Sequence, residues 1–535
     1  MSVRKRGCKV DKEPKIIRIT QPNTLQVVSA RAPRRQPTFE SLCIHDLRVY
    51  TSCLPDAYPG PLHYYGDSDG LEVDAVIELR GGRARAGKVG YNRQTDETKR
   101  EQLGSDPMNA STPAGNEPLR AALRHYDEVR DTYLRALGEH GVEFAPAGSS
   151  DAEIARLRGE LEKRGAQFRN AGASIRMGWI SKACIECTGN KGSETFSTTF
   201  KCHRDCYFCF NHNQADYDKF FREGCPWEEG LDRAAKTYEN GLAVIGLTGG
   251  EPLLSFEDSI RFLNRARELF PEAHKRMYTS GDLLTEDMAR RLRDADLQEI
   301  RFSVKDFDPE RVQERVLDAM RLAKRYIPDV MVEMPIIPGT EARMKELLAS
   351  FEEIGIRGIN MLEFCFPFHS WDEFARRGLS VRNPPFDVMY DYGYSGGLPI
   401  AGSEELALSL MIWAHDQGFS FGMHYCSLDN KHRSEMRQRN ERAAHAHPCF
   451  TFDEGDFFLK AGKVFGPDRE VARPVLATAG CTAMIDSDEE DSTTFPVRYL
   501  DYLRGVNVTP AVAFAVLESD ENGSYIQELD LRVAE

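Results

Sequence analysis

Residues 201–211 of the chain read KCHRDCYFCFN and place three cysteines, Cys202, Cys206 and Cys209, on one short stretch. Iron–sulfur clusters are held by cysteine thiolates, usually four of them. Three thiolates at this spacing can hold three corners of a cubic 4Fe–4S cluster, which leaves one iron open to a small molecule. Neighbouring cysteines can also form a zinc clip or remain unpaired buried thiols. The stretch therefore predicts a metal-binding loop, with these two structural alternatives beside it.

A second motif, Thr-Gly-Gly-Glu-Pro, follows about forty residues later. The apolar run before it predicts a buried strand, and the residues after it have the apolar spacing of a helix. Gly249 and Gly250 let the backbone approach a ligand closely at the end of that strand. Pro252, directly after Glu251, removes a backbone donor and fixes the direction in which the chain leaves the turn. We therefore expect a ligand at this strand end.

The same pattern of strand, polar turn and helix recurs as far as residue 369. Repeated strand–helix units predict a parallel sheet with helices outside it. Six such strands are expected between about residues 195 and 369, and a helix cap is expected at Thr285. Small, polar or thiol side chains are expected at the later strand ends, namely Thr279, Ser280, Gly281, Ser303, Lys305, Asp306, Glu363, Cys365 and His369.

The cysteine spacing followed by Gly-Gly-Glu-Pro resembles the radical S-adenosylmethionine (radical SAM) superfamily, over about residues 195–370. The resemblance implies an α/β fold, a partial (βα)6 barrel with function at the carboxyl ends of the strands, as in full barrels. It implies a 4Fe–4S cluster on Cys202, Cys206 and Cys209, whose open iron chelates the amino and carboxylate groups of SAM. One electron, from a donor such as flavodoxin or ferredoxin, then cleaves SAM to a 5′-deoxyadenosyl radical.

The resemblance also assigns the side chains and backbone that meet SAM. The methionine amino group is expected at the Gly-Gly-Glu turn, the adenine beside the last cysteine, and the ribose or carboxylate at the next two strand ends. Lys305 either supplies a cation to the carboxylate or is a solvated loop lysine. The assigned SAM-binding residues are Phe208, Gly249, Gly250, Glu251, Ser280, Ser303 and Lys305.

A Cys-x2-Cys pair, Cys184 and Cys187, precedes the cysteine loop. Such a pair suits one edge of a tetrahedral metal or of a second iron–sulfur cluster, but two further ligands are needed. Cys426 and Cys449 are the best candidates, with Cys365 next. The alternative is that all of them are reduced, partly buried thiols. The sequence thus predicts a second Fe–S cluster or a zinc ion, and reduced thiols without a metal are the alternative.

Composition limits the class of protein. The chain of 535 residues is long enough for two to four domains, and its formal net charge is −15. An acidic chain argues against broad nucleic-acid binding, because neutralising phosphates needs clustered cations. No run of 18 apolar residues is present, so no membrane span is expected. An odd number of cysteines, 13, favours thiols and metal ligands in a reducing cytoplasm.

Four segments are expected along the chain. Residues 1–36 carry ten Lys or Arg and two acids and predict a basic flexible arm. Residues 37–175 predict an N-terminal α+β extension with a hairpin near residues 71–92 and two helices after residue 117. Residues 195–380 form the barrel. Residues 381–535 predict a C-terminal α/β extension with a helix at 403–417, a strand at 419–426, a charged helix at 431–444 and short strands after residue 450, interrupted by an acidic loop at 488–491.

Three functions remain open at this point. The first is hydrogen abstraction from a peptide or protein, by a glycyl-radical activase or a peptide-modifying enzyme. The sequence SVKDF at residues 303–307, with no recognisable cobalamin domain, favours members related to pyruvate formate-lyase activating enzyme. The second is a small-molecule mutase, lyase or methylase. The third is a non-catalytic electron-transfer or sensing protein, which the Gly-Gly-Glu-Pro motif counts against because electron transfer needs no SAM site.

Overall fold

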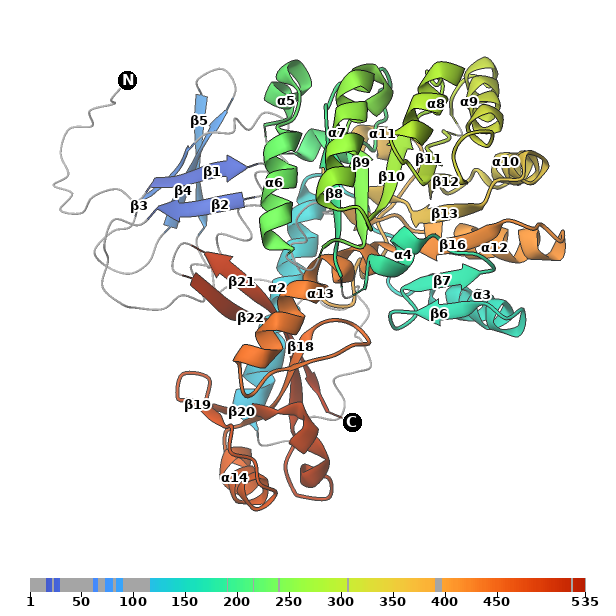
Figure 1. Ribbon diagram of the computed structural model, residues 1–535. Coiled ribbons are helices and arrows are strands. Elements are labelled where there is room, and N and C mark those ends of the chain that lie inside the picture. The colour runs from blue at the N-terminus through green and yellow to red at the C-terminus, as the bar shows by residue number, and fades with distance from the viewer. Residues whose placement is uncertain are drawn as a thin grey trace, which may run out of the picture. The chain divides into compact units, whose positions relative to one another are not determined.

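The computed structural model describes five N-terminal strands and residues 116–534, apart from residues 190, 215, 239–240, 306, 390–396 and 521–522 (Figure 1). The chain divides into two compact units. The first holds residues 1–111, 132–141 and 213–216, and the second holds the rest of the chain. Each unit is described by itself.

The first unit contains a five-stranded antiparallel sheet. The expected hairpin is confirmed, since β4 (Val73–Leu79) pairs antiparallel with β5 (Arg83–Val89). The flexible arm expected over residues 1–36 stays a prediction, and two strands lie within it. Segments rich in β-branched residues there form β1 (Ile16–Gln21) and β2 (Thr24–Val28), and β1 also pairs with β3 (Pro61–Tyr65). The other residues of the expected arm lie outside the described part of the chain.

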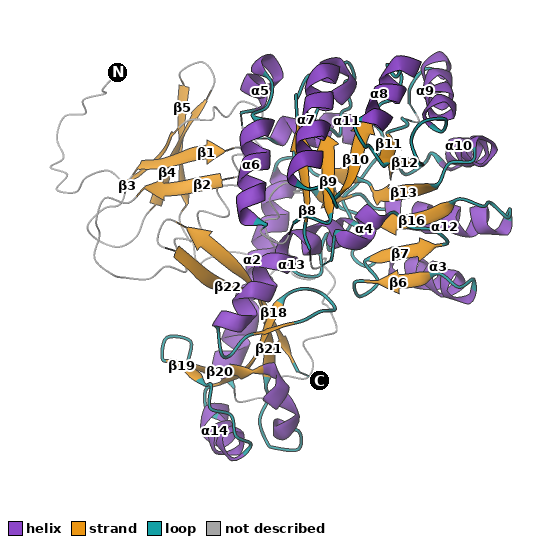
Figure 2. Cartoon of the chain, in the orientation of Figure 1, coloured by secondary structure: helices purple, strands orange, loops and turns teal. Residues whose placement is uncertain are grey.

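The second unit is built around a nine-stranded sheet. The six expected parallel strands are confirmed, and three more strands extend the sheet (Figure 2). The first strand beyond the six is parallel and the next pairs antiparallel with it. In sheet order the strands are β6 (Gln167–Arg169), β7 (Ser174–Met177), β16 (Gly422–Cys426), β13 (Gly358–Glu363), β12 (Asp329–Ile336), β11 (Glu299–Phe302), β10 (His274–Thr279), β9 (Val244–Thr248) and β8 (Ser193–Ser197).

Strand β16 shows that the sheet reaches further along the chain than residues 195–380. The long connection after β13 contains β14 (Cys365–Phe366), α11 (Trp371–Ala375), β15 (Leu398–Pro399) and α12 (Ser403–Asp416). Helix α12 packs against β12, β13 and β16, and therefore serves as the crossover helix that returns the chain to the same sheet.

Helices cover the outer face of this sheet (Figure 1). Alternate strand residues, such as Ile245 and Leu247, pack with apolar helix residues in one large core. The expected cap is confirmed, because the Thr285 hydroxyl accepts from the Met288 nitrogen at 3.3 Å. The helices of this layer are α3 (Asp151–Lys163), α6 (Trp227–Thr237), α7 (Phe256–Leu269), α8 (Glu286–Asp294), α9 (Glu310–Ala323), α10 (Glu341–Ile354) and α12. Shorter elements are α4 (Lys182–Glu186), η2 (Phe210–Asn213), α5 (Tyr217–Glu223) and η3 (Pro252–Ser255).

The C-terminal part forms a second, antiparallel sheet, as the short-strand pattern predicts. Leu119 of α2 (Glu117–Glu139) packs against it. The acidic loop at 488–491 is a turn between two strands, as expected, whereas helix α14 is an addition. The elements are α13 (Leu428–Ala446), β17 (Thr451–Phe452), β18 (Leu459–Phe465), α14 (Asp468–Thr478), β19 (Ile485–Ser487), β20 (Ser492–Pro496), η4 (Val497–Leu503), β21 (Ala511–Asp520) and β22 (Gly523–Val533).

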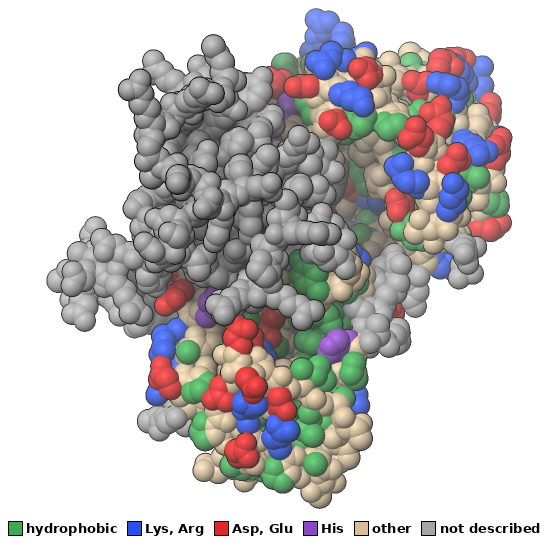
Figure 3. All heavy atoms as spheres, turned by 90° about the vertical axis from the view of Figure 1, so that its left-hand side faces the viewer, with side chains coloured by type: hydrophobic (Ala, Val, Ile, Leu, Met, Phe, Trp, Pro, Cys, Tyr) green, Lys and Arg blue, Asp and Glu red, His purple; other side chains and the backbone are tan. Residues whose placement is uncertain are grey.

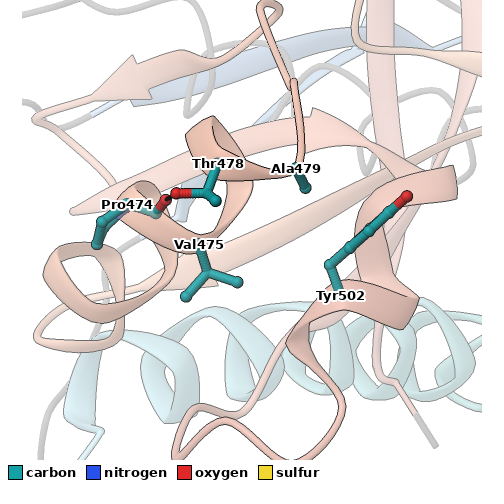
Figure 4. A pocket seen from close by; sticks show the side chains of 5 residues that line it. All are labelled: Pro474, Val475, Thr478, Ala479 and Tyr502. Atoms are coloured by element: carbon teal, nitrogen blue, oxygen red, sulfur yellow. Dashed lines mark hydrogen bonds between the residues drawn. The ribbon is translucent and has the colours of Figure 1, made fainter.

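Two surface features of the second unit bear on where a site can be. On the face shown in Figure 3, acidic and basic side chains of the described residues are interspersed and form no broad patch of one sign. A depression of about 460 Å³ between α14 and η4 is lined by Pro474, Val475, Thr478, Ala479 and Tyr502 (Figure 4). It contains none of the predicted site residues. In the described part of the chain, no helix is long and apolar enough to cross a membrane.

Candidate functional site

The two sequence motifs are joined through their backbones. The Gly250 nitrogen donates to the Thr199 carbonyl and the Glu251 nitrogen to the Lys201 carbonyl, both at 2.8 Å. Gly249 has a φ of +115°, which favours glycine. A Cβ atom on Gly249 would overlap the Thr199 carbonyl, and one on Gly250 the Lys201 carbonyl. The close approach expected of these glycines is therefore made to the start of the cysteine loop.

The Glu251 carboxylate is 1% exposed and accepts four hydrogen bonds from the protein. One oxygen accepts from the Leu253 nitrogen at 3.1 Å and the Thr279 hydroxyl at 2.7 Å. The other accepts from the backbone nitrogen and hydroxyl of Ser280, at 2.6 and 2.7 Å. Glu251 thus braces the end of β9 against the end of β10. Its expected contact with the amino group of SAM stays a prediction.

The three thiols of the cysteine loop lie close enough to affect one another. Burial raises the pKa of all three, and that of Cys206 to about 11, with Cys202 and Cys209 raising it further and Lys305 opposing them. Thiols with raised pKa values are protonated at neutral pH, so binding a metal here would release protons. Among the described residues, no three Cys, His, Asp or Glu side chains already meet at metal-binding distance.

Lys305 is buried beside this loop, with 8% of its surface exposed. Its ammonium donates to the backbone carbonyl and hydroxyl of Ser303, at 3.1 and 3.3 Å. No carboxylate in the described part of the chain lies within ion-pair distance of it. Its charge lowers the pKa of each of the three thiols. Lys305 is therefore no solvated loop lysine, and it offers a cation to an anionic ligand next to the cysteines.

A polar network missed by the sequence reasoning links the loop to the end of β10. The Ser280 hydroxyl lies 2.8 Å from a carboxylate oxygen of Asp282. Asp282 also contacts His203 at 3.0 Å and Arg204 at 3.1 Å, and Arg204 reaches Asp308 at 3.1 Å. Burial would raise the pKa of Asp282, but its bonds to Ser280 and His203 and the charge of Arg204 bring it below the usual value. In the sequence, the only local indication of this network is the charged residues between the first two cysteines.

Aromatic rings surround Phe208 beside the last cysteine. Its ring centre lies 5.4 Å from that of Phe364 and 5.9 Å from that of Phe307, which is partly exposed. His369, expected at a strand end, lies with its Nε2 2.8 Å from the Cys209 carbonyl and holds the loop. The three thiols, Phe208 and Lys305 therefore lie in one neighbourhood, and the two glycines that clamp the loop leave no room for side chains. This arrangement fits a cluster and an anionic ligand.

The four cysteines predicted for a second metal are only partly brought together. Burial raises the pKa of Cys426 to about 12, with Lys431 opposing the shift and Cys187 and Cys184 adding to it. Cys184 contacts Arg301 at 3.4 Å. Cys449 belongs to the C-terminal sheet instead, where its sulfur lies 3.5 Å from the Ala483 carbonyl. The structure does not assemble the four-cysteine set.

The parallel sheet with its cysteine loop and clamped glycine turn is the arrangement that the sequence resemblance implies. Residues 196–351 match the family model described as "Radical SAM superfamily". This segment, less than a third of the chain, is therefore a radical SAM domain, and that family implies a 4Fe–4S cluster and SAM as its cofactors.

Two curated proteins and two solved structures show how far the likeness extends. The chain is 28% identical over 296 residues to "Putative glycyl-radical enzyme activating enzyme MJ0021" of Methanocaldococcus jannaschii, covering 54% of this chain and 74% of that protein. It is 26% identical over 187 residues to GTP 3′,8-cyclase of Aliarcobacter butzleri, covering 33% and 56%.

Among solved structures, SuiB of Streptococcus suis bound to precursor peptide SuiA has a TM-score of 0.32 and 12% identity, covering 55% of this chain and 53% of that one. AnSMEcpe with bound AdoMet and Cp18Cys peptide has a TM-score of 0.25 and 18% identity, covering 31% and 50%. This chain thus spans about half the length of these solved structures and of the cyclase.

Proposed function

We propose that the chain cleaves SAM reductively at a 4Fe–4S cluster bound by Cys202, Cys206 and Cys209, and that it abstracts hydrogen from a peptide or protein. The observation that carries the proposal is the backbone clamp between the cysteine loop and the Gly-Gly-Glu-Pro turn, beside buried Lys305. The name of the Methanocaldococcus relative supports a protein substrate, because a glycyl-radical enzyme is the substrate of its activating enzyme.

The chain's own residues would bind and orient the cofactors. When bound, the cluster and SAM supply methionine and a 5′-deoxyadenosyl radical, after one electron from an external donor such as flavodoxin or ferredoxin breaks the S–C5′ bond. Lys305 would pair with the carboxylate of SAM, because it lacks a protein carboxylate. Phe208 would flank the adenine, and the rings around it would keep water away. Ser280 or Ser303 would bind the ribose or carboxylate, and Gly249, Gly250 and Glu251 the amino group.

Reconstitution of the full chain tests the cluster assignment. Iron, sulfide and 5′-deoxyadenosine are measured with SAM and a strong reductant, in the wild type and in a variant with Cys202, Cys206 and Cys209 changed to alanine. Cys225→Ala is the matched control, since Cys225 is a half-buried cysteine of the same region outside the triplet. We expect the triple variant to lose iron and deoxyadenosine and the control to keep both. Undiminished iron and SAM cleavage in the triple variant would refute the proposal.

A small-molecule substrate is the second candidate, favoured by the likeness to GTP 3′,8-cyclase. Deuterated substrates separate the two, because hydrogen abstraction transfers deuterium from the substrate to 5′-deoxyadenosine. Deuterium from a labelled candidate protein supports the first function. Deuterium that comes from labelled small molecules, and none from proteins, supports the second.

The second metal centre stays a proposal for Cys184, Cys187 and Cys426, because the charges of Cys184 and Cys187 contribute to the raised pKa of Cys426. Metal analysis of the cysteine-loop triple variant tests it, because any remaining iron or zinc must bind elsewhere. Stoichiometric residual metal that disappears on Cys187→Ala would support the site. Absence of metal from the triple variant would leave these residues as buried thiols.

A further inference from the structure

The inner face of the nine-stranded sheet carries a row of polar residues. In each strand the flanking residues, such as Met277 of β10 and Ile300 of β11, pack into the helix-covered core, so the residues between them face the other side. Gly246 follows this alternation, because a Cβ atom there would meet the Thr195 side chain and the Nε atom of Arg276. We call the residues of this face in neighbouring strands the row; they are Gly246, Arg276, Glu299, Arg301, Glu333, Asn360 and His424. Arg276 pairs in register with Gly246 and Glu299, and Asn360 pairs with Glu333 and His424.

Arg301 shows how this face accommodates a buried guanidinium with partners. It donates to Glu299 at 2.6 Å, to the Ser181 hydroxyl at 3.0 Å and to Glu333. It is fully buried, and every part of its fork is engaged. A buried arginine with two carboxylates is the ordinary arrangement, because an unpaired buried charge is strongly destabilising.

Arg276 has no such partners. It is 8% exposed and forms no hydrogen bond and no ion pair with the described residues. Its Nε atom is completely enclosed. Its guanidinium carbon lies 5.3 Å from the ring centre of Tyr278, and Glu333 is near, but the Glu333 carboxylate is already bonded by Arg301 and by Asn360 at 2.7 Å. Arg276 is thus a buried cation beside a carboxylate that other groups occupy.

Two further polar atoms of the row are enclosed without a hydrogen-bond partner, Asn360 Oδ1 and His424 Nδ1. His424 binds the Ser174 hydroxyl through its other nitrogen at 2.8 Å, and its ring is neutral because burial and then Arg301 lower its pKa to about 3. Glu333 and Tyr278 remain partly exposed, so solvent reaches this face. Unsatisfied buried groups of this kind cost free energy unless something binds them.

We propose that the inner face binds an anionic group of the substrate, a carboxylate or a phosphate, through Arg276. The planar guanidinium fork matches the two oxygens of either group, and Asn360 Oδ1 accepts a donor next to that anion. That the bound anion belongs to a substrate rests on the proposed function.

The position of Arg276 is compatible with the radical chemistry. Arg276 lies three residues before Thr279 on β10, and Thr279 bonds to Glu251 at the turn beside the cysteine loop. Three strand residues span about 10 Å. A substrate anchored at Arg276 would therefore extend toward the strand ends, where the reacting hydrogen must lie.

Anion binding by the reconstituted full-length protein tests the site without any SAM cleavage. Equilibrium dialysis with radiolabelled acetate and inorganic phosphate, at constant ionic strength set by sodium chloride, gives the affinity and stoichiometry. We compare the wild type with Arg276→Met and Arg276→Lys. Arg291→Met is the matched control, because Arg291 is half-exposed and paired with Glu257. We expect one site per chain for at least one probe, weakened at least tenfold in both Arg276 variants and unchanged in the control.

Thermal unfolding supplies a second measurement. If Arg276 only stabilised the fold, Arg276→Met would lower the unfolding temperature. Removing an unpartnered buried charge should leave Arg276→Met at least as stable as the wild type in chloride, and should abolish the extra stabilisation by the bound anion. Unchanged anion binding in both Arg276 variants, or absence of a saturable site in the wild type, would overturn the proposal. So would a clear loss of stability of Arg276→Met in chloride. A lack of deoxyadenosine formation would count against the proposed function and leave these anion results standing.

Discussion

The Glu251 backbone nitrogen donates to the Lys201 carbonyl at 2.8 Å, one residue before the first cysteine of the loop. This bond joins the turn after β9 to the chain that carries the three thiols. A motif expected to hold SAM therefore also sets the position of the predicted cluster ligands. The two motifs form one structural unit, and substitutions in one are expected to disturb the other.

Gly250→Ala should reduce iron binding as well as SAM binding. A single methyl group at this position would overlap the Lys201 carbonyl and displace the cysteine loop. We expect less iron per chain after reconstitution, by a factor of two or more. The matched control is Gly159→Ala in α3, where a Cβ atom meets nothing within 4 Å. Full iron content in Gly250→Ala would show that the clamp does not position the ligands.

Lys305→Met should weaken SAM binding about tenfold or more while the iron content stays unchanged. The reason is that the ammonium is buried and has no carboxylate partner among the described residues, so its charge is available to the carboxylate of SAM. A charge-assisted hydrogen bond of this kind contributes about 1.5–3 kcal/mol. Equilibrium dialysis with labelled SAM measures the dissociation constant.

The control for Lys305 is Lys345→Met, which removes a half-exposed lysine paired with Glu341 on α10. Its SAM affinity should equal that of the wild type. If Lys305→Met binds SAM as tightly as the control does, the ammonium has no part in the SAM site, and its bonds to Ser303 would be its whole role.

The six parallel strands and the cysteine loop could be predicted because their signals are local. Strands such as β9 and β12 are short, mainly apolar runs followed by glycine or polar residues, and the cysteine spacing needs no knowledge of distant segments. The place of β16 could not be predicted in the same way. Residues 364–421 separate it from β13, and only the packing of α12 shows that the chain returns to the same sheet.

The charged residues of the inner-face row are visible in the strand sequences, but the prediction of the strands made no use of them. Arg301 and Glu333 each stand between apolar residues of their strands, where a residue buried by helices would be apolar, and Arg276 lies in the polar first half of β10. By contrast, the contacts of Asp282 with His203 and Arg204 join segments far apart in the sequence. Such contacts depend on how the loop packs against the end of β10, which residue spacing does not specify.

Glu363, at the end of β13, gives the protein a pH dependence. Its carboxylate is 2% exposed and accepts from Arg382 and from the Leu428 nitrogen at the start of α13, both at 2.8 Å. Burial raises the pKa of Glu363 to about 7, with Arg382 opposing the shift and the nearby Glu404 adding to it. An unfolded glutamate has its ordinary pKa, near 4.5.

The folded chain therefore binds an extra proton at Glu363 between about pH 4.5 and 7. The stability that this proton confers is fully present below pH 4.5 and is lost as the pH rises through 7, and its total is on the order of 3 kcal/mol. In Glu363→Gln, urea unfolding between pH 5 and 8 should show a smaller loss of stability with rising pH than in the wild type. Glu346→Gln, which removes an exposed carboxylate of α10, should keep the wild-type slope. Equal slopes in Glu363→Gln and the wild type would mean that the buried carboxylate is ionised throughout this range, because Arg382 would then outweigh its burial.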